Sequence, residues 1–125
     1  MKELNYIDLF AGAGGLSEGF IRAGFKHIAH VEMNKDACDT IKTRTVYHWL
    51  KENKKTRIYN DYLKSETKNK EELWKNVPEH LINSVINKEI SENTLPEIFK
   101  TIDKELNGKK VDLIIGGPPC QAYSV

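Results

Sequence analysis

Glycine is concentrated in one short part of this chain, and that part constrains the fold more than any other. Five of the eight glycines lie between Gly12 and Gly24. They follow the largely apolar residues 6–10, which predict a short buried strand. Residues 16–23 then carry apolar side chains at helical spacing. A strand, a tight glycine turn and a helix in succession are typical of a parallel α/β sheet.

Three further strands are predicted, at residues 27–32, 57–60 and 111–115. Asn34 can cap a helix with one apolar face, formed by Cys38, Ile41, Thr45 and Trp49. The 48 residues from 63 to 110 exceed a usual connection, and we interpret them as a helical crossover enlarged by an insertion before the fourth strand. Its apolar faces comprise Leu81, Ile82, Val85 and Ile86, and Leu95, Ile98, Phe99, Ile102 and Leu106.

Composition limits the protein class. A length of 125 residues fits one domain at most, and 19 Lys and Arg against 18 Asp and Glu give no strong net charge. The two cysteines and four histidines show no metal-ligand spacing, so no metal is expected. The N-terminus lacks a signal-peptide core, and no run approaches the ~20 apolar residues of a membrane span. We therefore expect a soluble cytoplasmic protein with no membrane partner.

The glycine turn is placed where α/β folds bind nucleotides. The turn departs from the G-x-G-x-x-G pattern only at its third glycine, and Glu32 follows at the end of the second strand, where an acid can bind ribose hydroxyls. These features fit a nicotinamide dinucleotide or an adenosine-containing methyl donor. The alternative is a tight turn with no ligand.

A second motif follows the fourth strand. Residues 116–124 read Gly-Gly-Pro-Pro-Cys-Gln-Ala-Tyr-Ser, so a buried strand leads directly to Cys120 in a proline-stiffened loop. This arrangement is typical of a nucleophile at the carboxyl end of a sheet, and the alternative is a buried structural thiol. Cys38 lies on an apolar helix face and is expected to pack in the core.

The two motifs together resemble those of the DNA cytosine-5 methyltransferases. Residues 6–17 are similar to the family's first motif, and residues 117–124 to its catalytic motif. The resemblance implies a Rossmann-like S-adenosylmethionine-dependent methyltransferase fold. The chain would form the first half of a mostly parallel sheet and therefore a partial catalytic domain, residues 1–125.

The resemblance also implies a cofactor site for S-adenosylmethionine. Phe10, Gly12 and Gly14 would line it, and Leu16 would lie at the helix start near the methionine part of the cofactor. Glu32 would hold the ribose hydroxyls, and Met33 would pack against the adenine. Asp61, which follows the predicted third strand, would accept a hydrogen bond from the adenine amino group.

The catalytic motif carries the remaining roles by the same resemblance. Pro119 would shape the pocket, Cys120 would be the nucleophile, and Gln121 and Ser124 would face the DNA. A thiolate that adds to C6 of cytosine makes C5 nucleophilic enough to take the methyl group. The target base must leave the duplex to reach the thiol, so base flipping is implied.

Several parts of the family's catalytic domain have no counterpart in these residues. The glutamate that protonates the cytosine and the target-recognition domain are both missing, so the 125 residues alone are expected to be inactive. Two alternatives stay open: a non-catalytic S-adenosylmethionine-binding module, or one subunit of a split enzyme completed by a complementary polypeptide. A nicotinamide-binding fragment is disfavoured, because hydride transfer needs no thiol at this position.

Overall fold

A four-stranded, entirely parallel sheet forms the centre of the molecule, in the order β3-β2-β1-β4. The computed structural model describes residues 3–117. The strands are β1 (Asn5–Leu9), β2 (Lys26–Glu32), β3 (Val85–Asn87) and β4 (Leu113–Gly116). The helices are α1 (Gly15–Arg22), α2 (Lys35–Glu52), α3 (Thr56–Lys64), α4 (Lys70–Trp74), α5 (Glu79–Asn83) and α6 (Leu95–Leu106).

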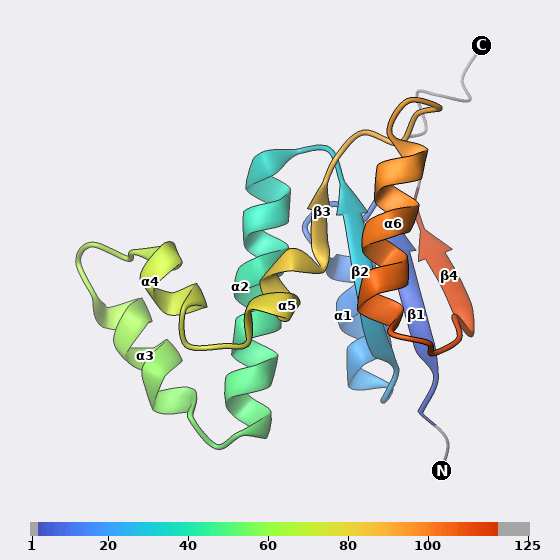
Figure 1. The fold of residues 1–125 in the computed structure, drawn as a ribbon. Coiled ribbons are helices and arrows are strands. Elements are labelled where there is room, and N and C mark those ends of the chain that lie inside the picture. The colour runs from blue at the N-terminus through green and yellow to red at the C-terminus, as the bar shows by residue number, and fades with distance from the viewer. Residues whose placement is uncertain (1–2, 118–125) are drawn as a thin grey trace.

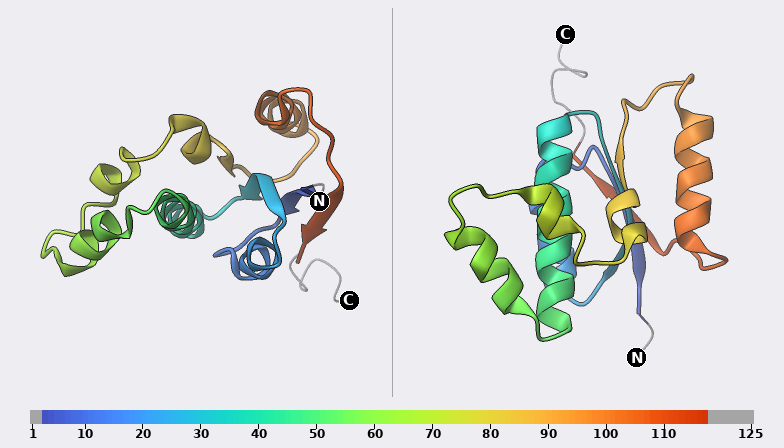
Figure 2. Two further views of the ribbon diagram at one scale, coloured as in Figure 1. Left: turned by 90° about the horizontal axis from the view of Figure 1, so that it is seen from below. Right: turned by 60° about the vertical axis from the view of Figure 1, so that its left-hand side comes forward.

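Helices cover both faces of this sheet. Helices α1 and α2 lie on one face and α6 lies on the other (Figures 1 and 2). The α6 face holds the main apolar core, in which Ile98 and Ile102 pack against Ile7, Val31 and Ile86 of three strands. This layered α/β architecture confirms the Rossmann-like fold expected from the sequence.

The remaining helices, α3, α4 and α5, form a separate layer against α2. In Figure 1 α3 and α4 stand on the far side of α2 from the sheet. They share an apolar cluster built on the buried Val46 and Leu50 of α2, with Leu73 and Val77 opposite. These helices therefore extend the domain sideways without covering the sheet.

The predicted third strand at residues 57–60 is wrong, because these residues lie within α3. Ile58, Tyr59 and Tyr62 recur at helical spacing and contact the apolar side of α2, which fixes the segment as a helix. The stretch 63–110 is consequently not a single helical insertion. It contains the true third strand, and the additional helices α3 to α5 precede that strand.

The third strand occupies residues that the sequence placed on a helix face. Leu81 and Ile82 are helical, but α5 ends at Asn83, and the Ser84 hydroxyl donates to the Leu81 carbonyl at 2.7 Å. The Ser84 carbonyl then accepts from the His30 amide of β2 at 3.0 Å. The β-branched Val85 continues this pairing, so the chain joins the sheet one residue after the helix has been closed.

Gly116 allows the edge strand β4 to approach β1. A Cβ atom at Gly116 would lie 2.3 Å from the Leu9 carbonyl oxygen, whereas a Cβ at Gly117 would meet nothing within 4 Å.

We predict that Gly116→Ala destabilises the fold by about 2–3 kcal/mol, because the Leu9 backbone cannot move aside as a flexible side chain can. Gly117→Ala is the matched control. Urea unfolding of both variants measures the difference, and equal midpoints would contradict this packing.

Candidate functional site

The carboxyl ends of the parallel strands meet at one edge of the sheet, and the glycine turn lies there. The turn links β1 to α1 through left-handed backbone, with φ of 57° at Gly12 and 87° at Gly14. The Ala11 amide donates to the Val31 carbonyl of β2 at 3.0 Å, and the Gly14 amide donates to the Ala11 carbonyl at 3.0 Å. The turn is therefore a fixed structure attached to the neighbouring strand.

Glu32 joins this turn to the end of β2. Its Oε1 accepts from the Gly12 amide at 3.0 Å, and its Oε2 accepts from the Asn34 amide at 2.7 Å. The Glu32 side chain thus lies beside the glycine turn. Each carboxylate oxygen can accept more than one hydrogen bond, so acceptor capacity remains for a ligand.

The first turn of α1 is left open at its N-terminus. Gly14 is the N-cap residue and, having no side chain, makes no side-chain capping bond. The leading amide groups of a helix need partners, and they favour negative or electron-rich groups. An uncapped helix start beside a glycine turn is therefore suited to ligand binding.

Large apolar side chains surround this turn without being buried. Phe10 is 39% exposed, Leu16 is 51% exposed and Met33 is 64% exposed. They come from the end of β1, the start of α1 and the end of β2. A ligand with apolar surface would find contacts with all three at this edge.

Asp8 is a buried acid of β1, close enough for the Glu32 charge to affect it, that the sequence analysis did not single out. It is 1% exposed, and neither carboxylate oxygen has a hydrogen-bond partner within the described residues. Burial raises the pKa of this carboxyl to about 6, and the nearby Glu32 charge adds to the effect. The signal in the sequence was a single acid inside an otherwise apolar strand.

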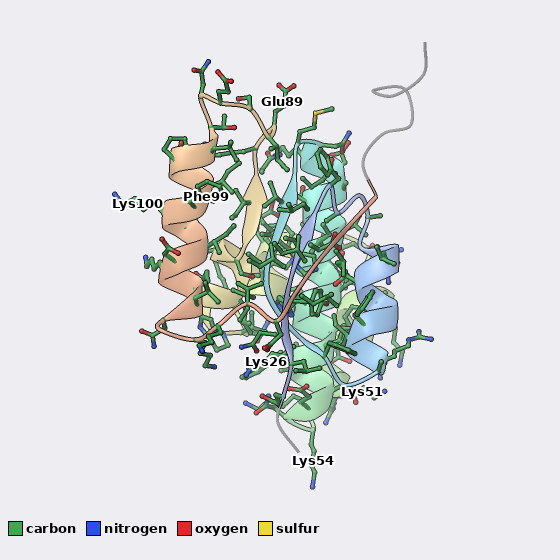
Figure 3. The ribbon with its side chains drawn as sticks, turned by 90° about the vertical axis from the view of Figure 1, so that its right-hand side faces the viewer. Lys26, Lys51, Lys54, Glu89, Phe99 and Lys100 are labelled. Atoms are coloured by element: carbon green, nitrogen blue, oxygen red, sulfur yellow. The ribbon has the colours of Figure 1, made fainter. Side chains whose placement is uncertain are left out.

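Asp61 does not lie at this edge, contrary to the sequence prediction. It is an exposed residue of α3, in the helical layer on the far side of α2 (Figure 1). The error follows directly from the misplaced third strand. The acid that follows the true third strand is Glu89, two residues after β3 ends. Figure 3 shows Glu89 at the end of the molecule opposite Lys26, Lys51 and Lys54.

The catalytic motif lies mostly outside the described residues. The predicted roles of Pro119, Cys120, Gln121 and Ser124 all fall there. What the structure does describe is the strand that leads to them. Gly116, at the end of β4, pairs with Leu9 at the end of β1, so β4 ends at the edge that carries the glycine turn.

Cys38 is a core residue, as the sequence predicted. It is 1% exposed, and its thiol donates to the Glu32 carbonyl at 3.2 Å. Burial raises the pKa of the Cys38 thiol to about 11, with the Glu32 carboxylate contributing. A thiol with so high a pKa is a poor nucleophile near neutral pH.

Two hollows of the protein surface lie outside the glycine-turn edge. One, of about 610 Å³, is lined by residues of α1, α2 and α3, and the other, of about 500 Å³, is lined by residues that include Lys26 and His80. The acids in the first hollow already have partners: Glu18 is hydrogen-bonded to His48 at 2.8 Å, and Asp39 is ion-paired with Lys70 at 2.7 Å. Size alone therefore does not mark the site, and the glycine-turn edge has the more specific chemistry.

Residues 3–117 offer neither a metal centre nor a membrane segment. No cluster of three or more His, Cys, Asp or Glu residues in this range could hold a metal ion. Over the same range, none of the helices combines the length and apolar character that crossing a bilayer requires.

Comparison with known proteins gives the family. The model of the C-5 cytosine-specific DNA methylases matches residues 4–68, just over half of the chain. The chain therefore belongs to the C-5 cytosine-specific DNA methylase family. This finding confirms the family suggested by the two sequence motifs.

The similar proteins are considerably longer. A type II methyltransferase of Bacillus paralicheniformis is 41% identical over 95% of this chain and 31% of its own length. One from Haemophilus parahaemolyticus is 32% identical over 98% of this chain and 22% of its own length. One from Herpetosiphon aurantiacus is 30% identical over 94% of this chain and 60% of its own length. The chain thus spans only part of each relative, and no solved structure matches it significantly.

Asp8 provides a test of the site's electrostatics. Its folded-state pKa of about 6 lies above the usual 3.8, so its contribution to stability is greatest at low pH and is lost as pH rises through 6. Asp8→Asn should therefore stabilise the fold by about 1–3 kcal/mol at pH 8, where a buried charge is removed. Most of this gain should vanish at pH 4. Urea unfolding at both pH values measures it, and an equal gain at both would refute the assignment.

Proposed function

We propose that this chain supplies the cofactor-binding part and the nucleophile of a DNA (cytosine-5)-methyltransferase. The reaction transfers a methyl group from S-adenosylmethionine to C5 of cytosine in DNA. The observation that best supports this proposal is the glycine turn hydrogen-bonded to Glu32, at the edge of the sheet where β4 ends shortly before Cys120 in the sequence. The family match and the names of the type II relatives support the same activity.

The residues at this edge fit S-adenosylmethionine in four respects. Glu32 retains acceptor capacity for the ribose hydroxyls, and the exposed Met33 offers an apolar surface for the adenine. The unpartnered Asp8 carboxylate supplies negative charge near a cofactor that carries ammonium and sulfonium groups. Glu89 takes the role expected of Asp61, because it is the acid that follows the third strand.

The remaining cofactor contacts follow the turn itself. Gly12 and Gly14 allow close approach to the backbone, and Phe10 and Leu16 border the turn with exposed apolar side chains. Pro119 is proposed to complete the pocket. When bound, S-adenosylmethionine supplies an electrophilic methyl group.

Cys120 is proposed as the nucleophile. Its thiolate adds to C6 of a flipped cytosine, and the electrons of the C5–C6 bond make C5 nucleophilic. C5 takes the methyl group as the bond between that methyl and the sulfonium breaks, which leaves a neutral thioether. A water molecule then accepts the C5 proton as the C6–sulfur bond breaks, which restores aromaticity and frees the thiolate. Gln121 and Ser124 are proposed to face the DNA.

Two other functions make different predictions. A module that binds S-adenosylmethionine without catalysis would bind cofactor but never form a DNA adduct. A subunit of a split enzyme would form the adduct only with a complementary polypeptide. The cysteine motif within a methylase family favours catalysis over the first of these.

Cofactor affinity tests the site residue by residue. Glu32→Gln should weaken S-adenosylmethionine binding by about 1–3 kcal/mol, because a charged acceptor of the ribose hydroxyls is lost. Glu89→Gln should weaken it as well, whereas Asp61→Asn should not. Isothermal titration calorimetry measures all three, with NAD as the competing ligand. Binding of NAD but not S-adenosylmethionine would overturn the cofactor assignment, and an effect of Asp61→Asn alone would overturn that of Glu89.

Adduct formation tests the nucleophile. In an active enzyme that contains this chain, DNA with 5-fluorocytosine should trap a covalent complex, because fluorine cannot leave C5 as a proton does. Cys120→Ser should abolish trapping, since a serine hydroxyl is scarcely ionised at neutral pH. Cys38→Ser is the matched control and should trap normally. Denaturing gel shift and peptide mapping give the readout, and an adduct on Cys38 would contradict the proposal.

A further inference from the structure

A buried row of three polar side chains lies next to the glycine turn, because Gly14 lines the same small cavity as two of them, Ser17 and His30. Tyr6 of β1, Ser17 of α1 and His30 of β2 are 0%, 1% and 2% exposed. The Tyr6 hydroxyl and Ser17 Oγ are 2.5 Å apart, and Ser17 Oγ and His30 Nε2 are 2.7 Å apart. The row therefore connects the first turn of α1 to the two strands that flank it.

This connection holds the first turn of α1 in place without capping it. The N-cap Gly14 makes no side-chain capping bond, which keeps the leading amides of the helix open. A helix start held by a capping side chain would lose part of that opening. Ser17 instead anchors the first turn from the side that faces the sheet, two residues after the helix begins at Gly15.

His30 stays uncharged in this setting. Burial lowers the pKa of its imidazole to about 3, with His27 adding to the effect, so the ring is neutral near neutral pH. The tautomer of this neutral ring decides whether His30 Nε2 or the Ser17 hydroxyl donates in the bond between them. Asp8 is the register neighbour of His30 on β1. Arg44 and Glu18 lie across the small cavity that His30 and Ser17 line, and they form an ion pair at 3.6 Å.

We propose that Ser17, held by His30 and Tyr6, is the positioning residue that fixes the glycine turn in its ligand-binding geometry. The role extends the proposed function and rests on it for the identity of the ligand. Removal of the Ser17 hydroxyl leaves the buried His30 Nε2 without the partner it has here. The Tyr6 hydroxyl keeps only its longer bond to the backbone carbonyl of residue 17, at 3.3 Å. The turn should then loosen, even though no residue facing the ligand has changed.

Ser17→Ala and Ser84→Ala form a matched pair of variants. Ser84 is similarly buried, at 2% exposed, and its hydroxyl also makes a hydrogen bond, but it lies where α5 meets β3. Both variants lose one buried hydroxyl, so both should lose stability. Tyr6→Phe keeps the bond between Ser17 and His30 and should have an intermediate effect.

Amide hydrogen exchange in the free protein tests the proposal without any ligand. Ser17→Ala should speed exchange at Gly14, whose amide donates to Ala11, by about tenfold relative to Ser84→Ala. Calorimetry should show about tenfold weaker S-adenosylmethionine binding for Ser17→Ala alone. Equal exchange at Gly14 in the two variants would overturn the positioning role. If exchange responds but the parent chain binds no S-adenosylmethionine, the cofactor assignment fails and the positioning role stands.

Discussion

The Glu32 carboxylate is the contact on which the site depends. It accepts one backbone hydrogen bond from the glycine turn and one from the start of the segment that leads into α2. A single side chain at the end of β2 thereby fixes the relative positions of β1, its turn and the next helix. The same carboxylate is the group proposed to bind the ribose, so the structural and the ligand-binding demands converge on one residue. A substitution that reverses the charge of residue 32 would therefore disturb the structure of the turn and ligand binding together.

Two layers of the molecule have different tasks. The sheet with α1, α2 and α6 brings the glycine turn, Glu32 and the end of β4 to one edge. Helices α3 to α5 bury their apolar residues against the outer side of α2, where Leu50 is fully buried. The long α2 therefore serves both layers, facing the sheet through residues such as Cys38 and the additional helices through Val46. Changes in α3 and α4 should therefore reach the site mainly through α2, whereas α5 also contacts β3 directly.

The sequence was informative where local patterns and tertiary contacts agree. The strand–turn–helix unit, the Asn34 cap, which accepts from the Ala37 amide at 2.9 Å, and the apolar face of α6 all could be predicted. The third strand could not, because Val85 and Ile86 follow Leu81 and Ile82 at helical spacing. The change from helix to strand depends on a tertiary contact, the bond that the His30 amide of β2 donates to the Ser84 carbonyl. The buried row of Tyr6, Ser17 and His30 could not be predicted from the sequence either. The register shift in the β1–β2 pairing places both His27 and His30 opposite Tyr6 and Asp8 on one face, although they are three residues apart.

The central claim is that the glycine turn, Glu32 and the residues after β3 form one cofactor site. Titration of the ¹⁵N-labelled chain with S-adenosylmethionine, followed by amide chemical shifts, tests this claim most directly. The largest changes should map to Gly12, Gly14, Met33 and Glu89, with Asp61 and the rest of α3 unchanged. Changes centred on α3, or on the hollow beside Lys26 and His80, would contradict the account.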